Sequence, residues 1–138
     1  IGKGDDEVRL KSIAKKLKLK NVIFTGFVSE AEKRKRLQRA WFTVNTSMVE
    51  GWSITNIEAN ACGAPVIGSN VPGIKDSVVD GKTGLLYKYG DHKELAKKIS
   101  SLIKNKRLRT KLQKGAIDWA NSFTWENAAK QFLKEMKD

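Results

Sequence analysis

The sequence predicts an α/β fold in which a mostly parallel sheet lies between two layers of helices. First, short apolar runs alternate with helical patterns at spacings too long for β-hairpins, which favours parallel strands covered on both faces. Second, the length of 138 residues suits one compact domain, taken here as residues 1–138. Third, every pattern after Asp91 is helical, which predicts a helical C-terminus.

The N-terminal part is predicted to contain two strands and two helices. Residues 1–4 are interpreted as the end of a strand and residues 21–27 as a second, short strand. Ser29, followed three residues later by Glu32, predicts a capping box that opens a basic helix ending near Arg39. Between the two strands, apolar residues recur at helical spacing: Leu10, Ile13, Ala14 and Leu17.

The middle of the chain is predicted to contain three strands and one helix. Residues 41–47 form a strand, and a helix follows at about residues 53–62. Residues 65–69 form the next strand, because the first residue of a strand can dispense with the N–H that proline lacks. Residues 71–84 are predicted to be a loop with one short helical turn, and residues 84–88 a last strand.

Three helices are predicted at the C-terminal end. Asp91 with Glu94 caps the first, and Thr124 caps the third, which ends at Met136. The second carries its apolar residues at helical spacing: Leu108, Leu112, Ala116 and Trp119.

A ligand site is predicted at one edge of the sheet. Ligands of parallel sheets bind outside the carboxyl ends of the strands. The site should therefore lie in the loops that follow Phe24, Thr46 and Ser69.

The net charge of the chain indicates a preference for negatively charged partners, but it does not identify which partner. The formal net charge of +12 attracts nucleic acid, anionic membranes and phosphorylated small molecules alike. No apolar run approaches the ~20 residues of a membrane span, and the single cysteine, Cys62, favours the reducing cytoplasm. The basic residues cluster in two regions: Lys33, Arg34, Lys35, Arg36 and Arg39, and then Lys97, Lys98, Lys104, Lys106, Arg107, Arg109 and Lys111.

The stretch "EGWSITNIEANACGAP" places a carboxylate on each side of a helix start. Residues 51–54 present backbone N–H groups that lack partners within the helix and lie at the positive end of its dipole, which favours phosphate. Glu50 beside them would repel a bare phosphate, so a hydroxylated group such as a sugar is expected between the two. Glu58, among apolar helical neighbours, suits the two hydroxyls of a ribose. Alternatively, Glu50 is a solvated loop charge and Glu58 pairs with a lysine.

The longer stretch "EGWSITNIEANACGAPVIGSNVPGIKDSV" resembles the E-x7-E region of the retaining GT-B glycosyltransferases of family 4. Further stretches resemble the donor-binding domain of that group in the same order: "IGKGDDEVRLKSIAKKL", "NVIFTGFVS", "DGKTGLLYKYGDHKELAKKI" and "FTWENAA". The resemblance implies a Rossmann-like C-terminal lobe that lacks its first part. It also implies transfer of a sugar from a nucleotide-diphosphate sugar to a glycan or lipid-linked acceptor.

The resemblance implies a role for each matching residue. Glu50 would act at the donor sugar as the catalytic residue, and Glu58 would hold the ribose. The backbone at Phe27 and Val28 would contact the nucleobase. Four residues would offer backbone N–H groups to the diphosphate and sugar: Gly51, Trp52, Ser53 and Ile54.

The sequence also departs from the family pattern. Trp52 and Ser53 stand where Phe and Gly are commonest. The family's diphosphate-binding Arg and Lys, and its N-terminal acceptor-binding domain, are expected to lie outside this chain. The chain alone is therefore expected to be inactive. The resemblance implies that no metal or other cofactor is required, and no Asp-x-Asp motif or His/Cys cluster suggests metal ligands.

Three other interpretations concern the partners of the chain. The basic helices are expected to contact an anionic membrane at its inner face, unless they are merely solvated. The sequence disfavours a nucleic-acid-binding module, because the tryptophans lie at packing positions rather than among the basic residues. A nucleotide-sugar epimerase of the same fold would need acid and base residues, and the only histidine, His92, is poorly placed for that role.

Overall fold

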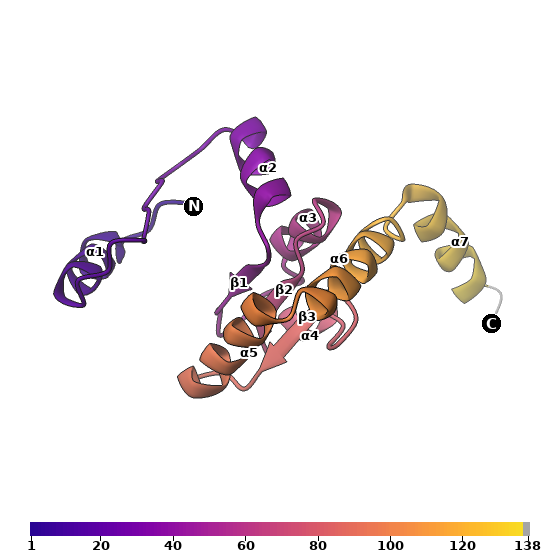
Figure 1. Ribbon diagram of the computed structural model, residues 1–138. Helices are drawn as coiled ribbons and strands as arrows, with labels where there is room; N and C mark the ends of the chain where they lie inside the picture. Colours follow the sequence, from indigo (N-terminus) through magenta and orange to yellow (C-terminus); the bar gives the residue numbers. More distant parts are fainter. Residues whose placement is uncertain (137–138) are drawn as a thin grey trace. The chain divides into compact units, whose positions relative to one another are not determined.

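The computed structural model describes residues 1–136, which belong to two compact units (Figure 1). Unit 1 comprises Ile1–Arg36, and unit 2 comprises Leu37–Asp138. The two units are described separately below. That residues 1–138 act as one domain stays a prediction.

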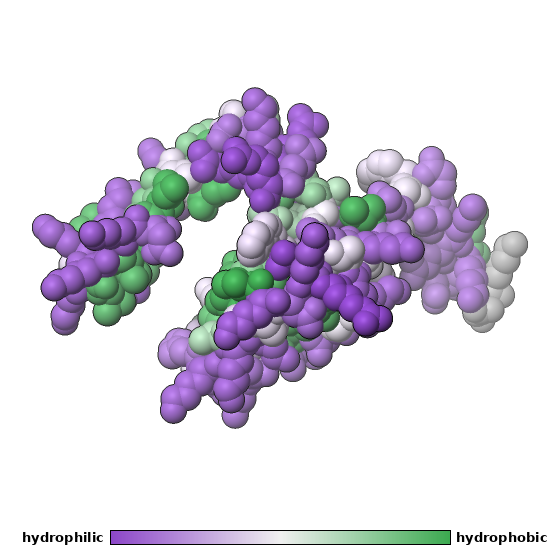
Figure 2. Space-filling view, in the orientation of Figure 1, coloured by the Kyte–Doolittle hydropathy of each residue, from purple (hydrophilic) through white to green (hydrophobic). Residues whose placement is uncertain are grey.

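Unit 1 contains helix α1 (Glu7–Lys16) and most of helix α2 (Glu30–Arg39), and it contains no strand. The strands predicted at residues 1–4 and 21–27 are therefore wrong. A strand needs a neighbour that bonds to it over several residues. Here the N–H of Gly2 donates to the carbonyl of Gly26 at 2.8 Å, and no other backbone hydrogen bond joins the two segments. No side chain of this unit is buried, and Figure 2 shows hydrophobic side chains at the surface near α1.

Unit 2 contains a parallel sheet of three strands, in the order β1 (Thr43–Asn45), β2 (Val66–Ser69) and β3 (Gly84–Tyr87). Val44 of β1 faces Ile67 of β2 in the register. The predicted parallel sheet is confirmed, although β1 is shorter than the strand expected at residues 41–47.

Helices cover both faces of this sheet. Val66 packs with Ala59 of α3 and Ile74 of α4, whereas Ile67 packs with Leu102 of α5 and Leu112 of α6. The alternation along β2 therefore produces two apolar layers, which confirms the three-layer prediction. None of the helices in the described residues is both long and apolar enough to cross a membrane. The helices of unit 2 are α3 (Ile54–Ala61), α4 (Ile74–Ser77), α5 (His92–Lys104), α6 (Lys106–Ala120) and α7 (Trp125–Glu135).

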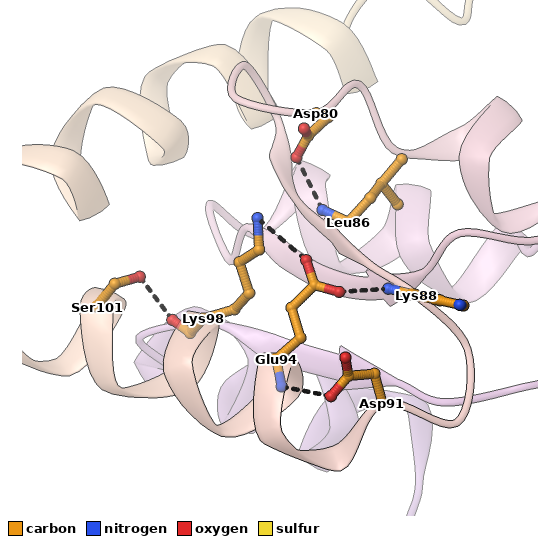
Figure 3. Close-up of polar contacts among 7 residues, drawn as sticks. All are labelled: Asp80, Leu86, Lys88, Asp91, Glu94, Lys98 and Ser101. Atoms are coloured by element: carbon orange, nitrogen blue, oxygen red, sulfur yellow. Dashed lines mark hydrogen bonds and ion pairs between the residues drawn. The ribbon is translucent and has the colours of Figure 1, made fainter.

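The start of α5 is fastened to the end of β3 by polar contacts (Figure 3). The Asp91 carboxylate accepts from the N–H of Glu94 at 2.9 Å, as predicted for a cap. The Glu94 carboxylate does not complete a capping box. It accepts instead from the N–H of Lys88 at 2.8 Å and lies 3.8 Å from the ammonium of Lys98. The start of α5 follows the carboxyl end of β3. In a parallel sheet this end lies at the same edge as the predicted site, so the contacts anchor α5 at that edge.

Helix α3 buries two asparagines that differ in their hydrogen bonding. The Asn56 amide donates to the hydroxyl of Ser77 at 3.0 Å and accepts from Asn45 at 3.1 Å. Asn60 is fully buried, and neither its amide nitrogen nor its amide oxygen has a partner within the described residues. A buried polar group without a hydrogen bond destabilises the folded state.

We therefore expect opposite effects from two matched substitutions in α3. Asn60→Leu should raise the free energy of unfolding by about 1–3 kcal/mol, because it removes an unpaired buried amide of similar size. Asn56→Leu should lower it by a similar amount, because Ser77 and Asn45 each lose one buried hydrogen bond. Urea denaturation followed by circular dichroism measures both values. A loss of stability in Asn60→Leu would contradict the expectation and indicate an internal water bound to Asn60.

Candidate functional site

The loops that follow β1 and β2 lie against each other at the carboxyl edge of the sheet. The hydroxyl of Ser69, the last residue of β2, donates to the carbonyl of Ser47 at 2.5 Å. Gly73 has a φ of +80°, and a Cβ built on it would lie 2.1 Å from the carbonyl oxygen of Glu50. The approach of the two loops therefore depends on the missing side chain at Gly73.

Five consecutive backbone N–H groups are unpartnered in the loop after β1 and the first turn of α3. From Gly51 to Thr55, no N–H donates to an acceptor within residues 1–136. The next one, of Asn56, donates to the carbonyl of Ser53 at 2.9 Å. Since α3 begins at Ile54, these groups lie at the positive end of its dipole. Such a row of donors can bind an anion.

Ser53 is the residue that turns the loop into α3. Its φ of 55° and ψ of 70° lie in the left-handed region, and its side chain is buried. The hydroxyl accepts from the Asn45 amide at 3.0 Å and lies 3.2 Å from the hydroxyl of Thr55. It makes no capping bond to the helix. Although serine is a common N-cap residue, the Ser53 hydroxyl does not cap α3, because it is held by its polar contacts with Asn45 and Thr55.

Asn45, at the end of β1, is a structural residue of the site that the sequence did not reveal. Its amide nitrogen donates to both Ser53 and Asn56, and its amide oxygen accepts from the N–H of Ser47 at 3.1 Å. Asn56 continues the network to Ser77, whose hydroxyl donates to the Gly73 carbonyl at 3.0 Å. The available signal was the pair of asparagines, Asn56 and Asn60, spaced four residues apart among the apolar residues of α3.

The two carboxylates of the motif are both half-buried. Glu50 accepts from the hydroxyl of Ser47 at 2.9 Å through one oxygen, and no described residue donates to its other oxygen. Glu58 lies on α3, eight residues further along the chain. Glu50 and Glu58 thus precede and follow the unpartnered N–H groups along the chain, and their roles toward a ligand stay predictions.

The side chain of Trp52 packs against an aromatic residue beyond the end of α6. Its ring contacts the ring of Phe123 edge-on, with centroids 4.7 Å apart, and Phe123 contacts Trp119 in the same way at 4.8 Å. The indole N–H of Trp119 donates to the carbonyl of Ser77 at 3.2 Å. These contacts anchor the loop, and the backbone N–H of Trp52 has no acceptor within residues 1–136.

The residues predicted to contact a nucleobase belong to unit 1. Phe27 is exposed and Val28 is half-buried. Their role stays a prediction. Within residues 1–136, no three His, Cys, Asp or Glu side chains gather as metal ligands.

Comparisons with known proteins identify the family. Residues 1–119 match the family model described as glycosyl transferases group 1. The chain is 29% identical over 141 residues to an uncharacterized glycosyltransferase of Methanocaldococcus jannaschii, which covers 100% of this chain and 40% of that protein.

Two solved structures have a similar fold. Sucrose-phosphate synthase from Thermosynechococcus elongatus has a TM-score of 0.84 and 28% identity, over 97% of this chain and 34% of that chain. HepE of Anabaena, in complex with UDP-glucose, has a TM-score of 0.81 and 24% identity, over 97% of this chain and 38% of the HepE chain. At this identity the likeness is evidence for a shared fold only. The chain thus spans less than half the length of these three proteins. Because the family model matches most of its length, this chain belongs to the glycosyl transferases group 1 family.

Proposed function

We propose that this chain is the donor-binding lobe of a retaining glycosyltransferase. The enzyme would transfer a sugar from a nucleotide-diphosphate sugar to a glycan or lipid-linked acceptor. The observation that carries the proposal is the row of unpartnered N–H groups from Gly51 to Thr55, at the start of α3 and beside Glu50. The solved complex of HepE with UDP-glucose supports a nucleotide sugar as the ligand.

The chemistry follows from the charges at the site. The donor diphosphate carries about two negative charges, and negative charge grows on the leaving phosphate as the glycosidic bond breaks. Preformed N–H groups stabilise that charge without reorganising. We propose that they do so without a metal or other cofactor. The free oxygen of Glu50 would accept from a hydroxyl of the donor sugar, and Glu58 would accept from the ribose.

The acceptor would be bound by a second lobe outside this chain. A helix start supplies roughly half a positive charge, which only partly balances a diphosphate. We therefore expect transfer only in the complete two-lobed protein. The single cysteine and the basic helices support a cytoplasmic enzyme that works at the inner face of an anionic membrane.

The N–H row can be tested by removing one donor at a time. Ile54 is the first residue of α3, where proline is tolerated in a helix, and its side chain is exposed. Ile54→Pro in the two-lobed protein should weaken binding of UDP, GDP or ADP sugars by about 10- to 100-fold, the effect of one hydrogen bond to a charged group. Ile54→Ala, which keeps the N–H, should bind as the wild type does.

Isothermal titration calorimetry measures both variants, and circular dichroism checks that each is folded. Equal affinities of the proline and alanine variants, with native folding, would contradict the proposed anion site. Failure of the wild-type protein to bind any nucleotide sugar would contradict the proposed function as a whole.

A further inference from the structure

A groove of about 450 Å³ lies between α6 and the turn before β3, and most of its charged lining residues are basic. Its charged residues are Lys82 in the turn, and Lys111, Lys114 and Asp118 on α6. Lys111 and Lys114 are three residues apart, so they project from the same side of the helix. The groove is thus lined by three lysines and one aspartate, which gives it a net positive charge.

The three lysines are not neutralised within the protein. No carboxylate of the described residues lies within 4.0 Å of the ammonium of Lys82, Lys111 or Lys114. Elsewhere in the chain comparable lysines do pair, as Lys11 does with Glu7 at 2.6 Å. Between His92 and Ala120 the chain carries nine of its 27 Lys and Arg residues and two of its 15 acidic residues. Figure 2 shows hydrophilic side chains where α5 and α6 lie.

The backbone holds this groove in shape. Gly115 lies between Lys111 and Asp118 on α6, and a Cβ built on it would lie 2.2 Å from the carbonyl oxygen of Lys82. The turn therefore rests directly on the helix. This contact places the base of the Lys82 side chain beside α6, next to the lysines of that helix. No ion pair among the described residues offsets the positive charge that the three lysines bring together there.

The groove is separate from the candidate donor site. Lys82 precedes β3, whereas the row of N–H groups follows β1 in the same parallel sheet. The groove therefore lies at the amino ends of the strands and the row of N–H groups at their carboxyl ends. A strand of four residues, such as β2, separates the two ends by roughly 13 Å. A donor held at Gly51–Thr55 would not occupy the groove.

We infer that this lysine groove binds a hydroxylated phosphate ester. Three unpaired ammonium groups suit a phosphate, while the Asp118 carboxylate and the Thr110 hydroxyl can accept from hydroxyls of the ester. A glycerol phosphate group has both features. It occurs in the headgroup of an anionic phospholipid and in soluble glycerol phosphates.

The test compares two triple variants that lose the same charge. The groove variant is Lys82→Gln with Lys111→Gln and Lys114→Gln. The control variant is Lys75→Gln with Lys130→Gln and Lys134→Gln, which alters exposed lysines outside both the groove and the basic helices. Binding is measured with phosphatidylglycerol vesicles, with phosphatidylcholine vesicles, and with glycerol 3-phosphate by NMR of the lysine ammonium groups.

For phosphatidylglycerol vesicles we expect the groove variant to bind on the order of 100-fold more weakly than wild type, since each lysine near such a surface contributes on the order of fivefold. The control variant should lose clearly less. Wild-type binding to phosphatidylglycerol alone would identify a lipid headgroup as the source. Binding to glycerol 3-phosphate as well, lost only in the groove variant, would identify a soluble ester. Equal losses in both variants, or no binding of any of the three probes, would overturn the inference, and neither outcome bears on nucleotide-sugar binding at the other edge.

Discussion

Replacing Gly73 with alanine is expected to abolish measurable nucleotide-sugar binding and to lower stability. At a φ of +80°, any Cβ is strained by about 1–2 kcal/mol. This Cβ would also lie 2.1 Å from the carbonyl oxygen of Glu50 and 2.7 Å from that of Gly51. The clash is with backbone, so the loop after β1 must move. That movement would displace the N–H groups that begin at Gly51, together with the carboxylate of Glu50.

Gly90 offers a matched control for this substitution. Its φ is +82°, and a Cβ built on it would meet no atom within 4 Å. Gly90→Ala should therefore show the cost of the left-handed backbone alone, without a loss of donor affinity. Chemical denaturation and calorimetric titration of both variants separate the two effects. If Gly73→Ala bound the donor as tightly as Gly90→Ala, the contact between the two loops would have no part in the site.

Replacing Glu58 with alanine is expected to weaken nucleotide-sugar binding by at least about 100-fold. A carboxylate that accepts from two ribose hydroxyls makes two hydrogen bonds to a charged group, each contributing about 1.5–3 kcal/mol. Glu58→Gln keeps the shape and should recover part of the affinity. The preference among UDP, GDP and ADP sugars should stay as in the wild type, because the ribose is common to all three.

This prediction needs a control for charge. Glu126 is an exposed glutamate at the start of α7, and Glu126→Ala removes the same charge far along the chain from the motif. It should leave donor affinity unchanged. An unchanged affinity in Glu58→Ala, measured on a protein with a native circular dichroism spectrum, would remove the proposed ribose contact.

Local patterns were sufficient for most of unit 2. The strands at 66–69 and 84–87, helix α3 and the three C-terminal helices all lie where apolar spacing and caps predict them. These elements are recognisable because each carries its own signal, such as Asp91 three residues before Glu94 or Thr124 three before Asn127. The row of N–H groups could be predicted too, because every helix start leaves its first N–H groups without an internal partner.

The sequence by itself thus determined the order of the elements of unit 2, its parallel sheet and the positions of Glu50, Glu58 and the helix start between them. Only the tertiary structure decided that residues 21–27 form no strand and that the Asn45 amide donates to the hydroxyl of Ser53. It also decided that the backbone of Gly73 packs closely against the carbonyl of Glu50. The reason is physical. Caps and apolar periodicity depend on neighbours within a few residues, whereas strand pairing and loop contacts join residues far apart in the chain and depend on distances that no local pattern contains.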